Sequence, residues 1–153
     1  MKTTLRPGLT RTTSYTVPPT RTVPHLLPES PDFAALPSVL ATGYMVAVIE
    51  WACMRVLHGH LDDGEITLGT HIDVSHDAPT LPGATVHVEA TLTEVDDRAL
   101  GFVVSARDDN GPISTGVHRR AIVDQARFTN RLDRLRDRPA GDDRAQAVPK
   151  AIG

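Results

Sequence analysis

The sequence is poor in aromatic residues, which make up 4% of its 153 residues, and it contains a single cysteine, Cys53. One cysteine excludes an intrachain disulfide and fits a reducing compartment, so we expect a cytoplasmic protein. The 16 basic and 19 acidic side chains give a formal net charge of −3, which disfavours a general electrostatic grip on nucleic acid. Residues 1–13 contain no apolar run typical of a secretory signal peptide. The length is that of one domain.

Proline dominates the first quarter of the chain. Residues 1–13 are polar and expected to be loose, and Ser14–Val17 is predicted to form a short strand. Between residues 18 and 37, prolines recur too often for a long helix. The segment 18–37 is therefore predicted to be an ordered loop or a set of broken helical turns. Long loops of this kind often act as lids over binding sites.

The next segment, from Ser38 to about Gly59, is almost free of charge. Ser38 follows a proline and has the side chain of a helix N-cap, and Glu50 and Arg55 are the only charged residues before Leu57. A helix that is apolar almost all round lies in a core or in a membrane. This run is too short and too often interrupted for a membrane span. The sequence therefore predicts a central core helix and no membrane partner.

Apolar and polar residues then alternate, in four stretches separated by turn sequences. Each stretch has one apolar face, and only the helix is available to cover it. We therefore expect an α+β domain over residues 14–128, with an antiparallel sheet of about five strands wrapped around one helix and the last four strands in a meander. A short amphipathic helix and a disordered tail are expected in residues 129–153. On the first of the four strands, the alternation predicts that the side chains facing the helix are Leu68, Ile72, Val74 and, near the end of the strand, His76.

Glu50 interrupts the most apolar part of the predicted helix. A buried carboxylate is costly unless it is hydrogen-bonded, and such groups gather at functional sites. Glu50 is therefore a candidate catalytic residue. The alternative is a structural role, at a partly hydrated interface or paired with a residue such as Arg55.

Thr42 and His76 are the other candidate catalytic residues. Thr42 lies near the start of the helix, where free backbone N–H groups favour an oxyanion, although a threonine there can also simply satisfy a helix carbonyl. His76 is the histidine that the alternation places inward most clearly, and a lone inward histidine is often only a core residue.

Gly69 interrupts a strand pattern and indicates a bulge or a close backbone approach. Cys53 is expected to fill the core, and no metal site is expected at His58–Asp63.

These segments resemble a known family. FAALPSVLATGYMVAVIEWACMRVL followed by LGTHIDVSHDAPTLPG is similar to the hot-dog-fold thioesterases of the fluoroacetyl-CoA thioesterase group. The resemblance implies a catalytic set of Thr42, Glu50 and His76, with the Gly69 backbone helping to position the acyl group. It also implies a homodimer that pairs sheets edge to edge with the active site near the interface, an acyl-CoA substrate, and neither a metal nor a redox cofactor.

The resemblance also marks a lid over the acyl pocket. The family places two phenylalanines there; Phe33 matches the first, and Leu36 stands at the second, which affects selectivity for a fluorinated acyl group. Arg119 and Arg120, on opposite faces of the last strand, are candidate contacts for the phosphates of CoA. The predicted function is hydrolysis of a short-chain acyl-CoA, with substituted or fluorinated acyl groups among the candidates. The alternatives are a non-catalytic acyl-CoA-binding protein and a hydratase or dehydratase on the same fold.

Overall fold

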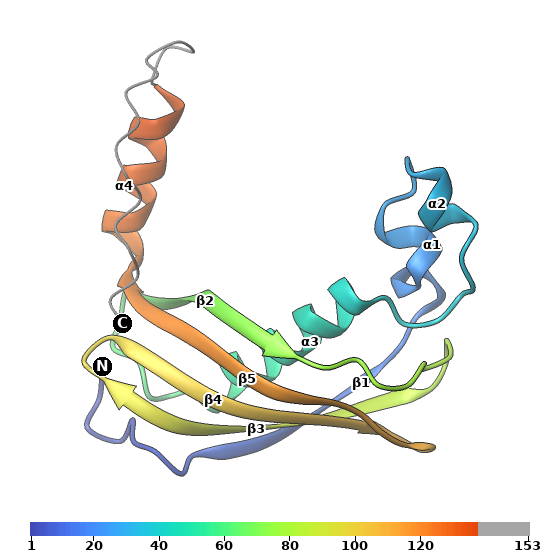
Figure 1. Ribbon diagram of the computed structural model, residues 1–153. Helices are drawn as coiled ribbons and strands as arrows, with labels where there is room; N and C mark the ends of the chain where they lie inside the picture. Colours follow the sequence, from blue (N-terminus) through green and yellow to red (C-terminus); the bar gives the residue numbers. More distant parts are fainter. Residues whose placement is uncertain (138–153) are drawn as a thin grey trace.

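The computed structural model describes residues 1–137, in which a curved antiparallel sheet lies against one long helix, α3 (Figure 1). The disordered tail expected after Pro139 lies outside these residues. The strands are β1 (Thr10–Thr16), β2 (Glu65–Val74), β3 (Thr85–Asp96), β4 (Ala99–Asp108) and β5 (Gly111–Asp124). The helices are η1 (Pro19–Arg21), α1 (Val23–Leu26), α2 (Pro31–Ala34), α3 (Thr42–Val56) and α4 (Gln125–Arg136).

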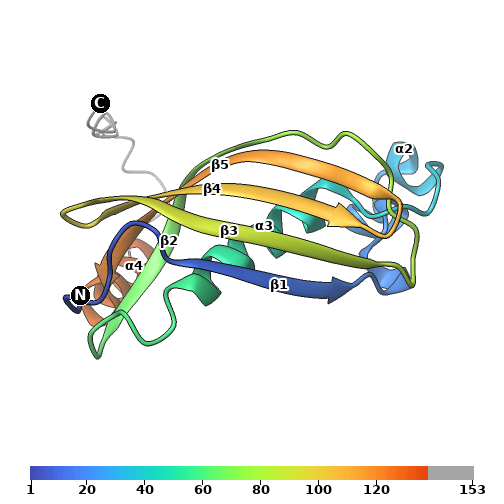
Figure 2. The ribbon, with the colours of Figure 1, turned by 90° about the horizontal axis from the view of Figure 1, so that it is seen from below.

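The order of strands in the sheet is β1-β3-β4-β5-β2. The expected α+β architecture and the five strands are confirmed, and Figure 2 shows the sheet passing across α3. The expected meander of the last four strands is wrong, because β2 pairs with β5 at the far edge and only β3, β4 and β5 follow one another. Alternation fixes which face of a strand is buried and leaves its neighbour in the sheet undetermined.

The core lies between α3 and the concave face of the sheet. The apolar residues predicted to face the helix are buried along β3 and β4, and they pack with the buried side of α3. Because alternate residues of a strand point to opposite faces, one face of each strand supplies this core. The buried apolar side chains of this face are Val86, Val88, Ala90, Leu92, Leu100, Phe102, Val104 and Ala106.

The helix begins four residues later than predicted, at Thr42, with Ala41 as its N-cap. Ser38 is exposed and lies outside the helix, so its expected role as N-cap is wrong. The backbone N–H of Leu40 instead donates to Thr80 O (2.8 Å), and Leu40 forms a bridge with Thr22. These contacts draw the chain into an extended form up to Ala41. As a result, Thr42 is the first helical residue.

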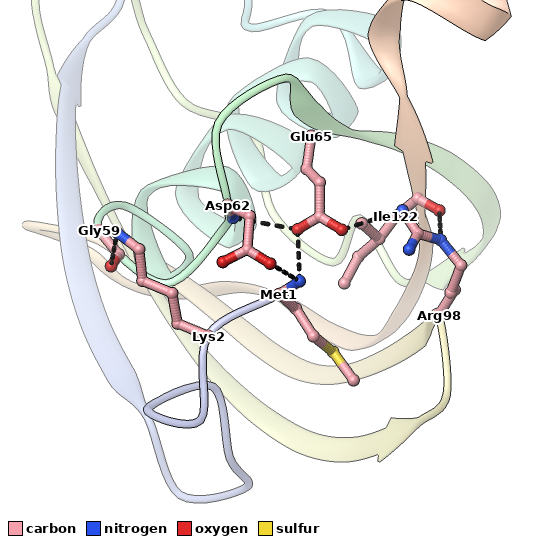
Figure 3. A network of polar contacts seen from close by, with 7 residues as sticks. All are labelled: Met1, Lys2, Gly59, Asp62, Glu65, Arg98 and Ile122. Carbon is pink, nitrogen blue, oxygen red and sulfur yellow. Dashed lines mark hydrogen bonds and ion pairs between the residues drawn. The ribbon is translucent and has the colours of Figure 1, made fainter.

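The N-terminal end of the predicted domain is more ordered than expected. β1 starts at Thr10, and the segment before it is held by hydrogen bonds such as Gly8 N to Leu92 O (2.8 Å). The Met1 ammonium pairs with Asp62 and Glu65 next to the start of β2 (Figure 3). The amphipathic helix predicted after Asp124 is α4, which begins at Gln125.

Candidate active site

The first cluster of candidate residues joins the start of α3 to the loop after β2. The Thr42 hydroxyl lies 2.8 Å from His76 Nδ1. His76 is half-buried, and its Nε2 is buried with no hydrogen-bond partner among residues 1–137. An unpaired buried nitrogen is costly, so Nε2 requires a partner that residues 1–137 of one chain do not supply.

The loop that carries His76 is fixed on β5. Ser75 N donates to Thr115 O (2.9 Å) and Asp77 N donates to Ile113 O (2.8 Å), so the backbone is held on both sides of the histidine. The first turn of α3 also leaves backbone N–H groups without partners in the helix. The cluster therefore combines a positioned imidazole, a hydroxyl and the positive end of a helix dipole.

The second cluster surrounds Glu50 in the middle of α3. Arg120 Nη1 donates to Glu50 Oε2 at 2.9 Å. The Arg120 side chain is 3% exposed, whereas that of Glu50 is 38% exposed. Arg120 also donates to Thr67, from Nε to Oγ1 (3.0 Å) and from Nη2 to the carbonyl oxygen (2.9 Å). Within the described chain, Oε1 of Glu50 has no hydrogen-bond partner, so it is free to meet water or a substrate carbonyl.

His118 completes this cluster from β5. Its Nδ1 lies 2.7 Å from His71 O, and its Nε2 lies 3.0 Å from Arg120 Nη1. The residue is 1% exposed. Burial and the neighbouring Arg120 charge lower the pKa of His118, outweighing the hydrogen bond to His71 O that acts in the opposite direction. The ring is therefore held neutral beside the guanidinium.

Gly69 provides room for this cluster. A Cβ added at Gly69 would lie 3.1 Å from Glu50 Oε2 and 3.2 Å from His118 Cε1, so the backbone approaches both side chains closely. The β2–β5 register shifts between Gly69 and His71, which confirms the bulge expected there. Across this bulge, the side chains that face α3 change from odd-numbered to even-numbered positions.

The exchange of faces corrects one predicted orientation. Before the bulge, Thr67 and Gly69 face α3, and after it Ile72 and Val74 do so. The predicted inward position of Leu68 is therefore wrong, because the alternation was carried unbroken through the extra residue.

The two clusters lie apart in one chain. Thr42 and Glu50 are separated by eight helical positions, about 12 Å along the axis. No hydrogen bond joins Glu50 to His76 within residues 1–137. A hollow of about 350 Å³ on the other side of α3 contains none of the three candidate catalytic residues. It is lined by Tyr15, Arg21, Tyr44, Ala47, Val48 and Trp51.

The lid segment lies at the same end of α3 as Thr42 (Figure 1). Its Leu26 side chain sits where a Cβ on Gly43 would fall, at 3.2 Å, so a glycine in the first turn of α3 lets α1 pack closely. Phe33, on α2, is half-buried, whereas Leu36 is 50% exposed. Leu36 thus presents an apolar side chain to solvent.

The two neighbouring arginines of β5 have different surroundings. Arg119 is exposed on the face away from α3, and Arg120 is buried against Glu50. Arg120, predicted as a candidate contact for a CoA phosphate, is not available for that role, because its donors are engaged by Thr67, Glu50 and His118. Arg55, considered as a partner for Glu50, lies over the ring of Trp51.

Sequence reasoning missed the support that β5 gives to Glu50. His118 and Arg120 lie four and two positions before the buried Ile122, on the same face of β5. Ile122 was therefore the signal that both polar side chains face α3. His118, which the sequence did not single out, is more deeply buried than His76.

Three further features concern the single cysteine, metal ligands and membrane-spanning helices in residues 1–137. Cys53 is fully buried, and burial raises the pKa of its thiol to about 12. In residues 1–137, no three histidine, cysteine or acidic side chains are grouped so as to hold a metal ion. No helix in this part of the chain is long and apolar enough to span a membrane.

Comparison with known proteins gives one consistent family. Residues 24–126 match the family model described as fluoroacetyl-CoA-specific thioesterase. The chain is 46% identical over 132 residues to a fluoroacetyl-CoA thioesterase from Streptantibioticus cattleyicolor, covering 86% of this chain and 95% of that protein.

Solved structures agree with this result. A variant of the fluoroacetyl-CoA thioesterase in complex with acetyl-CoA is 44% identical, with a TM-score of 0.84 over 86% of this chain and 98% of that one. A hot-dog-like protein from Thermanaerovibrio acidaminovorans is 21% identical, with a TM-score of 0.72 over 84% of this chain and 91% of that one, which supports the fold alone.

Proposed function

The chain belongs to the fluoroacetyl-CoA-specific thioesterase family, and on that premise we propose how its two clusters hydrolyse a short-chain acyl-CoA. It is a hot-dog-fold thioester hydrolase. This membership decides against the binding-only and hydratase alternatives. The observation that carries the assignment of residues is the pairing of Glu50 with Arg120 beside Gly69, because it fixes one carboxylate oxygen and leaves the other without a partner in residues 1–137.

Glu50 is the group that starts the reaction. Its Oε2 is held by Arg120, and its Oε1 is left to attack the thioester carbonyl or to take a proton from an attacking water. In the first route an acyl-enzyme anhydride forms and water then hydrolyses it. In the second route water adds directly. Both routes release the carboxylic acid and the free thiol of CoA.

Thr42 and His76 act on the carbonyl oxygen and the leaving group. The Thr42 hydroxyl and the free N–H groups of the first turn of α3 stabilise the oxyanion. His76, oriented through Nδ1, offers Nε2 as acid or base. A thiol with an ordinary pKa of about 8.5 leaves readily, so the oxyanion and the nucleophile are the main demands on the protein.

Release of free thiol from acetyl-CoA and fluoroacetyl-CoA tests these roles. We expect E50Q and H76A to lose on the order of 100-fold or more in kcat/KM. E89Q is a matched control, because Glu89 is an exposed carboxylate on β3. Full turnover by E50Q or H76A would overturn the assignment.

We further propose that the active site is completed by a second copy of the chain. β2 forms an edge of the sheet, and this edge carries the Gly69 bulge. Pairing of two β2 strands antiparallel brings the end of one β2, with the loop of His76, toward the Gly69 region of the other. This arrangement supplies the partner that Nε2 lacks and brings the two clusters together.

A mixed dimer tests the shared site. E50Q and H76A are co-expressed with different tags, and the heterodimer is isolated by sequential affinity steps. If each site takes His76 from one subunit and Glu50 from the other, one site of the heterodimer is intact, and activity returns to about half that of the wild type. If each subunit holds a whole site, the heterodimer is as inactive as both parents.

The acyl group is selected in part by the lid. Acetyl-CoA and fluoroacetyl-CoA are proposed substrates, on the basis of the relatives' names and the bound acetyl-CoA in one of them. Leu36 is smaller than phenylalanine and exposed, so the pocket is expected to be less strict toward a fluorinated acyl group. L36F should raise the ratio of kcat/KM for fluoroacetyl-CoA over acetyl-CoA, and an unchanged ratio would contradict the role of the lid.

A further inference from the structure

His118 forms a second layer behind the carboxylate of Glu50. The His71 carbonyl can only accept a hydrogen bond, so Nδ1 of His118, 2.7 Å from it, carries the proton. An arginine can only donate, so Nε2 of His118, 3.0 Å from Arg120 Nη1, must be the unprotonated nitrogen. The two neighbours therefore define one neutral tautomer.

The same Arg120 nitrogen that donates to His118 also donates to Glu50. Nη1 lies 3.0 Å from His118 Nε2 and 2.9 Å from Glu50 Oε2, so the imidazole and the carboxylate share one guanidinium group. The rest of Arg120 is held by Thr67. Because Arg120 is nearly fully buried, these hydrogen-bond acceptors, rather than water, fix the position of its guanidinium group.

We propose that His118 is a positioning residue that, as a neutral hydrogen-bond acceptor, holds Arg120 against Glu50 and so aims the carboxylate at the thioester. This inference rests on the proposed function of Glu50. His118 itself does not touch the substrate in this role. Without its Nε2, Arg120 turns more easily away from Glu50, and the carboxylate loses its fixed direction.

The close backbone approach at Gly69 supports this role. A Cβ at Gly69 would meet both the Glu50 carboxylate and the His118 ring, so both side chains border the same space. The bulge at this point of β2 lies beside His71, whose carbonyl oxygen accepts the hydrogen bond from His118 Nδ1. One local irregularity thus places the glycine and orients the histidine.

Two substitutions with side chains of similar size distinguish a role of His118 as a hydrogen-bond acceptor from a role in packing alone. Gln in H118Q offers an amide oxygen near the place of Nε2, whereas Met in H118M fills the space without a good acceptor. We expect H118M to lose on the order of tenfold or more in kcat with KM within about threefold of wild type, because a hydrogen bond to a charged group is removed. H118Q should stay within about threefold in kcat.

The matched control is H87M, which replaces a sheet histidine that bonds Ser14 on the face away from α3. Equal losses of kcat in H118Q and H118M, or no loss in H118M, would overturn the inference. If wild type and H87M release no thiol from any acyl-CoA, the proposed function fails instead.

A measurement on the wild-type protein covers the case in which H118M does not fold. The ¹⁵N shifts of the His118 ring report its tautomer directly. We expect a neutral ring protonated at Nδ1 at pH 7. An imidazolium, or a ring protonated at Nε2, would exclude the hydrogen bond from Arg120 and overturn the inference whatever the activity.

Discussion

Thr42 Oγ1 and His76 Nδ1 lie 2.8 Å apart, which ties the first residue of α3 to the loop that follows β2. The hydroxyl fixes the direction of the imidazole ring, and His76 Nε2 is left without a partner in the described chain. An orienting hydrogen bond on one ring nitrogen and a free second nitrogen are the arrangement that a histidine acid or base requires.

Removal of the Thr42 hydroxyl should cost activity more than stability. T42V keeps the shape of the side chain and loses the hydrogen bond to His76, so we expect kcat/KM to fall by about 10- to 100-fold. T42S keeps the hydroxyl and should stay within several-fold of wild type. T16V, which breaks a hydroxyl pair at the sheet edge, is the control. A T42V enzyme as fast as T16V would contradict the role of this contact.

A methyl group at Gly69 should impair the site without unfolding the protein. G69A places its Cβ 3.1 Å from Glu50 Oε2, and the flexible carboxylate must move. We expect kcat/KM to fall on the order of tenfold or more. Unfolding in urea should show a change in stability of less than about 1 kcal/mol.

G101A is a matched strand-glycine control for G69A. A Cβ at Gly101 meets Glu94 at a similar distance, 3.1 Å, away from the site. Its activity should remain that of wild type. Equal activity losses in G69A and G101A would point to a general effect on the sheet rather than to crowding of Glu50.

His118 should make folding stability depend on pH. Its pKa is lowered in the folded protein from 6.5 by burial and by Arg120, against the opposing influence of Glu50 and the His71 carbonyl. Below 6.5 the unfolded chain therefore binds a proton that the folded chain resists, and the free energy of unfolding falls as the pH falls.

Urea unfolding between pH 5 and 8 measures this effect. The loss of stability below about pH 6.5 should be shallower in H118M than in wild type, because the group that titrates is gone. H87M should follow the wild-type curve more closely. Parallel curves for wild type and H118M would show that His118 is protonated equally in both states.

Cys53 should be inert in the folded protein. Burial raises the pKa of its thiol to about 12, so about one part in ten thousand is thiolate at pH 8. A disulfide exchange reagent should label Cys53 slowly in buffer and rapidly in urea. Rapid labelling in buffer would mean that the core around α3 opens frequently.

The sequence by itself determined the fold class and the position of one anomalous carboxylate, Glu50, in the central helix. The apolar run around Glu50 predicted a core helix, and the alternation of β3 and β4 fixed their buried faces. Periodicity is a local property, so it can be recognised without knowing which segments lie beside the strand or helix. Glu50 and the bulge at Gly69 were visible for the same reason.

Only the tertiary structure decided which strands are neighbours and which side chains are in contact. The place of β2 beside β5, the start of α3 at Thr42 and the reversal of faces at the bulge depend on contacts between distant segments. So does the burial of Arg120 against Glu50, with His118 behind it. A hydrogen bond between residues 70 positions apart leaves no trace in the local pattern, because its geometry is set by the packing of the whole sheet on the helix.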